Sequence, residues 1–289
     1  YDNFGDNVFE QQTASNNWDT PAIKLTAPLQ YTTTDGTVHD IDSMLTNFDF
    51  IADPTALDNS DVDGKLYVYG TNEGFDYADG KLAANSYSNH SLSILSTSDM
   101  VNWTDHGEIL NSSQVPWGRP EGGFMWAPDC AYKNGTYYFY FPHPSETAWN
   151  DSWKIGVATS RYPDRDFKVQ GYIKGMDSLI DPCVFIDDDG QAYIYHGGGG
   201  ICKGGKLKDN MMELDGEMLR MEGLVDFHEA PWVHKYNGKY YLSYSDNHDE
   251  NMNDGVKGDN RMRYAISDSP LGPWKHQGIY MEPTDSYTN

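Results

Sequence analysis

The sequence predicts an all-β protein, a five-bladed β-propeller built from four-stranded antiparallel blades. Three observations lead to this prediction: a hairpin pattern that repeats along the chain, a second strand pair after most of these hairpins, and no sustained helical periodicity. The chain has 289 residues, of which 38% are hydrophobic and 14% are aromatic. This supply is enough for the core of one large all-β domain, and the aromatic residues favour strands.

Four segments share one hairpin pattern, in which a proline opens a short apolar strand, an Asp-Gly or Asn-Gly turn follows, and a tyrosine-rich strand closes the hairpin. These segments begin at Ala52, Ala127, Asp181 and Ala230. Asp-Gly and Asn-Gly pairs adopt the positive φ angles of tight turns at little cost. Each segment is therefore predicted to form the inner pair of strands in one blade.

A second pair of strands around a polar turn is predicted after three of these hairpins. These pairs begin at Ser91, Lys154 and Met262, whereas the third hairpin has only a loose counterpart that starts at Gly205. Two successive hairpins make a four-stranded antiparallel sheet, which is one propeller blade.

The opening prolines recur at intervals that, continued, place the start of a fifth blade near Asn289, where the sequence ends. The fifth blade is therefore expected to be incomplete in this chain. Residues 1–45 are interpreted as an N-terminal region, with a polar tail over 1–20 and a half-blade over 21–45. Residues 46–289 are interpreted as the propeller domain that carries the function.

Three inner strands begin beside a carboxylate. The first strand of a blade starts at the central channel, so Asp53 and Asp181, directly before their opening prolines, and Glu229, one residue further out, are expected to converge. An Asp beside Pro is more often a turn residue, but three carboxylates at equivalent repeat positions favour a function. Hydrolysis of a glycosidic bond needs one carboxylic acid and one carboxylate, and a third carboxylate can raise the pKa of the acid.

Charge limits the partners of this chain. Lys and Arg total 20 against 44 Asp and Glu, for a formal net charge of −24. Such a field repels nucleic acid and anionic lipid, so neither nucleic acid nor a membrane is an expected partner, while a neutral oligo- or polysaccharide is. No apolar run reaches transmembrane length. The cysteines, Cys130, Cys183 and Cys202, lack C-x-x-C spacing and are predicted to be small core residues.

A series of short motifs carries a resemblance to a known family. In chain order they are ADP from Ala52, NWTDHG from Asn102, WAPD from Trp126, IDPCVFIDDDGQAYIY from Ile180, HEAPWVHKYNGKYYLSYS from His228 and SDSPLGPW from Ser267. With these motifs the chain resembles glycoside hydrolase family 43, the five-bladed propeller enzymes that act on arabinans, xylans and related hemicelluloses. The resemblance covers roughly residues 46–289.

The resemblance implies roles for individual residues. It implies an inverting mechanism in which Asp53 is the general base, Glu229 the general acid, and Asp181 the carboxylate that modulates the pKa of the acid and helps to position it. Trp126 matches an aromatic residue near the sugar, with a core tryptophan as the alternative. His228, beside Glu229, is a candidate substrate contact, with a buried, hydrogen-bonded histidine as the alternative.

The expected function is that of an α-L-arabinofuranosidase or β-xylosidase, which hydrolyses glycosidic bonds of arabinan, xylan or arabinoxylan. A non-catalytic, lectin-like propeller is the alternative. No cofactor is expected to be required. The resemblance also implies a calcium ion at the propeller centre, linked to a histidine of the fifth blade, but no ligand for it can be assigned in this sequence. A secreted or periplasmic location is expected, with the cytoplasm as the alternative.

Overall fold

The computed structural model describes residues 50–73, 91–119, 122–146, 152–176, 180–246 and 261–281, together with short strands at 9–11, 23–25, 29–32, 38–41, 77–78 and 81–82. These residues form mainly antiparallel β-strands. None of the helices in these ranges is long and apolar enough to cross a membrane.

Four four-stranded antiparallel sheets make up the described body of the protein. Blade 1 contains β5 (Phe50–Asn59), β6 (Lys65–Glu73), β9 (Ser91–Thr97) and β10 (Trp103–Asn111), and blade 2 contains β11 (Asp129–Lys133), β12 (Thr136–Pro144), β13 (Trp153–Ser160) and β14 (Lys168–Tyr172). Blade 3 contains β15 (Ile180–Ile186), β16 (Ala192–Gly198), β17 (Ile201–Lys206) and β18 (Leu219–Arg220), and blade 4 contains β19 (Glu229–Tyr236), β20 (Lys239–Ser245), β21 (Met262–Ser267) and β22 (Lys275–Met281). The prediction of an all-β propeller with four-stranded blades is confirmed.

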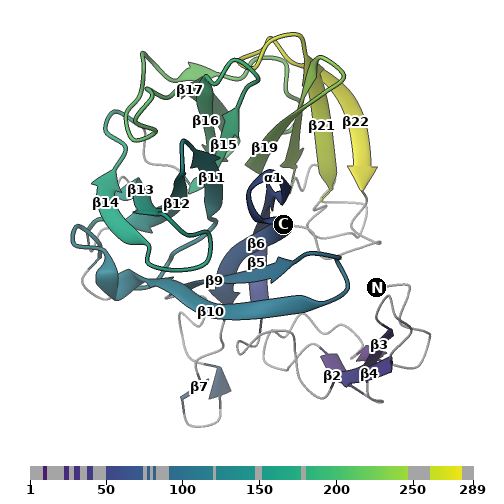
Figure 1. Cartoon of the computed structure of the whole chain (residues 1–289). Helices are drawn as coiled ribbons and strands as arrows, with labels where there is room; N and C mark the ends of the chain where they lie inside the picture. Colours follow the sequence, from purple (N-terminus) through teal and green to yellow (C-terminus); the bar gives the residue numbers. More distant parts are fainter. Residues whose placement is uncertain are drawn as a thin grey trace.

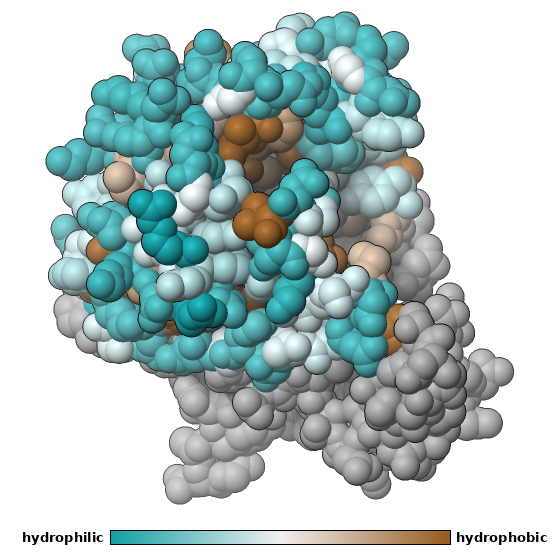
Figure 2. Space-filling view, viewed as in Figure 1, coloured by the Kyte–Doolittle hydropathy of each residue, from teal (hydrophilic) through white to brown (hydrophobic). Residues whose placement is uncertain are grey.

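The four blades stand around a common centre, with the first strand of each blade on the inside (Figure 1). The first strands contact one another in the order β5, β11, β15, β19. As expected for a propeller, each blade thus delivers the start of one strand to a shared central channel. The face seen in Figure 1 is mostly hydrophilic, and hydrophobic residues gather in a hollow near its centre (Figure 2).

The inner hairpins turn where the sequence predicts. Asn134 and Gly135 have φ angles of 51° and 74°, and Asn237 and Gly238 have φ angles of 47° and 73°, so both pairs form two-residue turns with positive φ at both positions. In blade 1 the turn is one short helix, α1 (Ser60–Asp63), which ends at Gly64 in the left-handed region.

The core lies between the faces of neighbouring blades, and it follows from the alternation of side chains along each strand. In β12, Phe139 and Phe141 pack in the cluster shared with blade 1, whereas Tyr140 packs in the cluster shared with blade 3. A third cluster, between blades 3 and 4, contains Tyr195 and Tyr244. The three cysteines are free and buried, as predicted.

The outer part of blade 3 departs from the expected boundaries. Its third strand begins at Ile201, before the predicted start at Gly205, and its fourth strand is only the pair Leu219–Arg220. The reason lies in Gly199 and Gly200, whose φ angles of 60° and 84° allow the chain to reverse directly after β16.

Further strands pair outside the four blades. In the N-terminal region β1 (Phe9–Gln11) pairs with β2 (Ile23–Leu25), and β3 (Leu29–Thr32) pairs with β4 (Val38–Ile41). Two more short strands, β7 (Tyr77–Ala78) and β8 (Lys81–Leu82), form a hairpin between β6 and β9. The half-blade over 21–45 and the boundary at residue 46 stay predictions.

Candidate active site

A pocket of about 640 Å³ lies where the inner strands of the four blades begin. Its lining combines carboxylates, prolines and apolar side chains, and a volume of this size is ordinary for a small-molecule site. The lining residues are Asp53, Pro54, Thr55, Ala56, Trp126, Ala127, Pro128, Asp129, Ile180, Asp181, Pro182, Glu229, Ala230, Pro231, Trp232, Ser243 and Met262.

A β-bulge interrupts the inner strand of three blades at the opening proline. The residue before each of these prolines has a positive φ: 51° at Asp53, 56° at Asp181 and 57° at Ala230. At the same points the pairing register shifts, between Ala52 and Thr55 in blade 1 and at the equivalent positions in blades 3 and 4. At a bulge, two residues of one strand lie opposite a single residue of the partner strand. The bulge therefore changes the direction of the side chains before and after it.

These bulges explain how the carboxylates reach the channel. A non-glycine residue with positive φ costs on the order of 1–3 kcal/mol, and such strain is concentrated at functional sites. Aspartate tolerates this region better than most residues, which suits Asp53 and Asp181. In blade 4 the strained position holds Ala230, and the carboxylate belongs to the preceding residue, Glu229, which pairs with Ser245.

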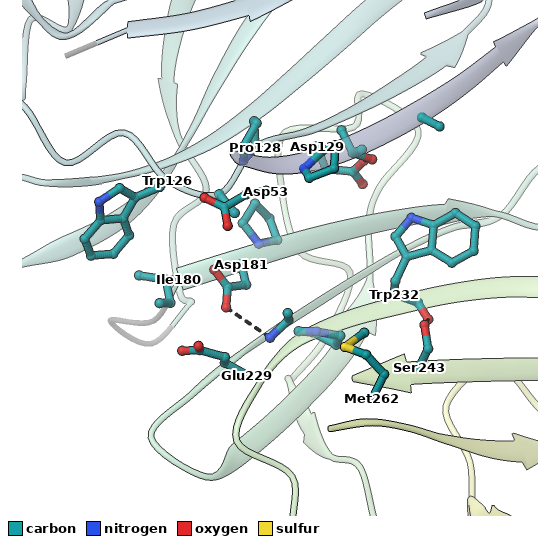
Figure 3. Close-up of a pocket in the computed structure, with 17 residues that line it drawn as sticks. Asp53, Trp126, Pro128, Asp129, Ile180, Asp181, Glu229, Trp232, Ser243 and Met262 are labelled. Carbon is teal, nitrogen blue, oxygen red and sulfur yellow. Dashed lines mark hydrogen bonds between the residues drawn. The ribbon is translucent and has the colours of Figure 1, made fainter. Parts of the chain in front are cut away.

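The three predicted carboxylates line the same pocket, as the sequence analysis expected. In Figure 3, Asp181 lies between Asp53 and Glu229. The hydroxyl of Thr71 on the neighbouring strand β6 donates a 3.1 Å hydrogen bond to Oδ2 of Asp53. Glu229 is more open, with 24% of its side chain exposed.

Asp181 is the central and most buried of the three carboxylates, at 9% exposure. Its Oδ2 accepts a 3.0 Å hydrogen bond from the backbone N–H of Ala230, and the N–H of Ala127 also bonds to the carboxylate. Burial, followed by the negative charges of Glu229 and Asp53, raises the pKa of Asp181 well above its ordinary value, although the two backbone N–H groups oppose this shift. The site thus retains a proton at a pH at which isolated carboxyl groups are ionised.

Trp126 lines the pocket from blade 2, at the position that corresponds to Glu229 in blade 4. Its indole stacks on Trp153, with ring centroids 4.8 Å apart and an interplanar angle of 27°. The ring of Phe124 meets it edge-on at 6.2 Å. An indole held by two aromatic neighbours presents a firm apolar surface to whatever enters the pocket.

His228, the other predicted substrate contact, lies beside Glu229. It lies outside the set of described residues that line the pocket. Its Nε2 is 3.7 Å from Oε2 of Glu229, and its backbone N–H donates to the carbonyl oxygen of Ser245. His228 therefore touches the pocket through Glu229, and a contact with substrate stays a prediction.

Asp129 is a fourth carboxylate in the pocket lining, and it is not among the site residues predicted from the sequence. It follows the opening proline of blade 2, within the WAPD motif, and this place was the signal that could have identified it. The residue is 5% exposed, and burial raises its pKa to about 6 against three hydrogen bonds that lower it.

A metal site was also expected from the resemblance. In the part of the chain that the structure describes, no three His, Cys, Asp or Glu side chains are grouped so that they could hold a metal ion. The calcium ion stays an expectation of the resemblance.

The sequence matches a known protein family over most of its length. Residues 48–285 match the family described as glycosyl hydrolases family 43. Over 288 aligned residues the chain is 33% identical to a β-xylosidase from Xylanibacter ruminicola, covering 83% of this chain and 82% of that protein. It is also 33% identical to a xylosidase/arabinosidase from Bacteroides ovatus, covering 83% of this chain and 81% of that protein.

A solved structure shows the same likeness. It is a family 43 β-xylosidase/α-arabinofuranosidase from a compost microbial metagenome, in complex with xylotriose and in a calcium-free form. It superimposes with a TM-score of 0.67 at 30% sequence identity, covering 82% of this chain and 79% of that chain.

Proposed function

The chain belongs to glycosyl hydrolases family 43 and is a glycosidase, and we propose that it hydrolyses α-L-arabinofuranosyl or β-D-xylosyl linkages of hemicellulose with inversion at the anomeric carbon. The observation that carries this proposal is the presence of Asp53, Asp181 and Glu229 in one pocket. The names of its relatives, which include both xylosidase and arabinosidase, support this choice of sugars.

In the proposed reaction, Asp53 acts as general base. It accepts a proton from a water molecule whose oxygen attacks the anomeric carbon. At the same time Glu229 donates its proton to the leaving oxygen, and the bond between that oxygen and the anomeric carbon breaks. This division between a base and an acid on opposite sides of the sugar is what an inverting glycosidase requires.

Asp181 is proposed to support the acid and not to replace it. Its carboxylate accepts hydrogen bonds from the backbone N–H groups of Ala230 and Ala127. Glu229, by contrast, is partly exposed in the pocket. The proton that Asp181 and Glu229 share is therefore proposed to pass to the leaving oxygen from Glu229. The pair is proposed to hold one proton in common, and the negative charge that remains on the pair makes loss of this proton less favourable before the reaction.

Trp126 is proposed to bind the sugar that is cleaved. The C–H groups of one sugar face can pack against its indole, which is fixed by the stack on Trp153. Ile180 adds a second apolar contact on the same side of the pocket (Figure 3).

A panel of nitrophenyl glycosides tests the proposed function. Release of nitrophenol from the α-L-arabinofuranoside or β-D-xyloside, and not from a β-D-glucopyranoside control, would support it. Xylotriose binding measured by calorimetry, without hydrolysis of any glycoside in the panel or of xylotriose, would contradict it and favour the carbohydrate-binding alternative.

A further inference from the structure

Asp129 is the carboxylate of the pocket that the proposed mechanism does not use. It is the first residue of β11 and follows the opening proline of blade 2. Its side chain is turned into the protein, where it is 5% exposed. In Figure 3 it lies beyond Asp53, on the side of the pocket away from Glu229.

The carboxylate of Asp129 links three neighbouring blades. Oδ1 accepts a 2.7 Å hydrogen bond from the hydroxyl of Thr55 in blade 1. Oδ2 accepts a 2.5 Å hydrogen bond from the backbone N–H of Val184 in blade 3. Oδ1 also accepts from the N–H of Cys130 in its own strand, at 2.8 Å. One buried side chain thus holds the inner strands of blades 1, 2 and 3 together.

Both partners in the neighbouring blades lie just after a bulge that carries a catalytic carboxylate. Thr55 is two residues beyond Asp53, and it is the first residue to regain the pairing of β5 with β6. Val184 is three residues beyond Asp181, one step after the pairing of β15 with β16 resumes. A bulge weakens the local ladder, so the direction of each strand start depends on contacts beyond that ladder.

We propose that Asp129 is a positioning residue, which sets the spacing between Asp53 and Asp181 by binding Thr55 of one strand and Val184 of the other. The inference rests on the proposed function, because it assigns Asp129 a part in that reaction. Asp129 itself transfers no proton to or from the substrate. Its effect on the reaction passes through the direction in which the two strands present their carboxylates.

Four variants and one control test this proposal. Thr55→Val keeps the shape of the side chain and removes only the hydroxyl donor, whereas Thr55→Ser keeps that donor. Asp129→Asn replaces one acceptor oxygen by a donor, and the double variant Thr55→Val/Asp129→Asn tests whether the two residues act together. The control is Tyr137→Phe, which removes a buried 3.1 Å hydrogen bond between blades 1 and 2, from the Tyr137 hydroxyl to Asn59 at the far end of the same strand β5.

The expected result is a loss of kcat without a matching change in KM. Displacement of a catalytic group by about 1 Å can cost about 100-fold, so we expect kcat to fall about tenfold or more in Thr55→Val and in Asp129→Asn. Thr55→Ser should recover most of the activity. The double variant should be no slower than Asp129→Asn, because Thr55 acts through Asp129. Tyr137→Phe should lose about as much thermal stability as Thr55→Val but keep the kcat of the wild type.

Two results would overturn the inference. One is a wild-type kcat in both Thr55→Val and Asp129→Asn; the other is a double variant whose loss is the product of the two single losses. Either result with an active wild-type enzyme leaves the proposed function intact. Failure of the wild type to hydrolyse any glycoside would instead remove the proposed function, and this inference with it.

Discussion

The backbone N–H of Ala230 donates a 3.0 Å hydrogen bond to Oδ2 of Asp181. Ala230 directly follows Glu229, so this bond fastens the start of β19 to the carboxylate of the neighbouring blade. The position of Glu229 and the charge beside it thus depend on the same side chain. In the proposed mechanism Asp181 uses this arrangement both to orient the acid and to keep a proton in the pocket.

Replacement of Glu229 by Gln should nearly abolish the hydrolysis of substrates with poor leaving groups. A general acid typically contributes about 10²–10⁴-fold, so xylo- or arabino-oligosaccharides should be cleaved slower by this factor. A nitrophenyl leaving group needs less protonation, so the loss on nitrophenyl glycosides should be smaller. Steady-state kinetics on both substrate classes measures the difference.

Glu217→Gln is a matched control for this variant, because Glu217 is exposed in the loop between β17 and β18. It should leave both rates unchanged. A Glu229→Gln enzyme that is slowed less than about tenfold on the oligosaccharide would exclude Glu229 as the acid.

Replacement of Asp53 by Asn should slow both substrate classes by the same factor. The base acts on the attacking water, whose activation does not depend on the leaving group, and its loss typically costs about 10²–10⁴-fold. The matched control is Asp61→Asn in the exposed turn α1. Circular dichroism should show that both variants are folded. A loss in Asp53→Asn that is much larger for the poor leaving group would assign Asp53 to protonation and contradict its role as base.

Replacement of Asp181 by Asn should move the alkaline limb of the pH–rate profile to lower pH. Burial and the carboxylates of Glu229 and Asp53 raise the pKa of Asp181, so the neighbouring groups share a proton that they lose only at elevated pH. Without the negative neighbour, the proton needed for the reaction is lost more easily and therefore at lower pH. An alkaline limb that stays in place or moves upward would show that Asp181 only orients its neighbours.

Asp129 should leave a signature in the pH dependence of stability. Its pKa is raised from 3.8 to about 6 in the folded protein, so the folded state binds this proton more tightly than the unfolded state. Its contribution to the free energy of unfolding is therefore largest below pH 3.8 and is lost as the pH rises through about 6.

Urea unfolding of the wild type and of Asp129→Asn over this pH range measures that contribution. The difference in unfolding free energy, wild type minus variant, should fall by up to about 3 kcal/mol as the pH rises. Other carboxylates titrate in both proteins and cancel in the difference. A difference that does not change with pH would contradict the raised pKa of Asp129.

The repeated hairpins could be predicted from the sequence because their signals are local. Each one combines an opening proline with an Asp-Gly or Asn-Gly turn, and turns such as Asn134-Gly135 adopt the positive φ angles that these residues favour. The convergence of Asp53, Asp181 and Glu229 followed from the repeat, since equivalent positions of successive blades meet at one channel.

The remaining features of the site depend on contacts that span the chain. The link that Asp129 makes between blades could not be predicted because its partners, Thr55 and Val184, are 74 and 55 residues away in the sequence. The bulges were missed because an Asp-Pro pair does not show whether it lies in a regular strand or at a shift of register. Trp232, Ser243 and Met262 line the pocket from blade 4 without any local signal that separates them from other strand residues.

The stereochemistry of the first product tests the central claim most directly. In the proposed mechanism Asp53 activates the water and Glu229 protonates the leaving oxygen, so the glycosidic bond is displaced in a single step. Proton NMR during hydrolysis of a β-D-xyloside should therefore show α-xylose first, with β-xylose appearing only at the rate of mutarotation. With an α-L-arabinofuranoside the β-anomer should appear first. First appearance of the sugar with the configuration of the substrate would require a covalent intermediate and would contradict the roles assigned to these carboxylates.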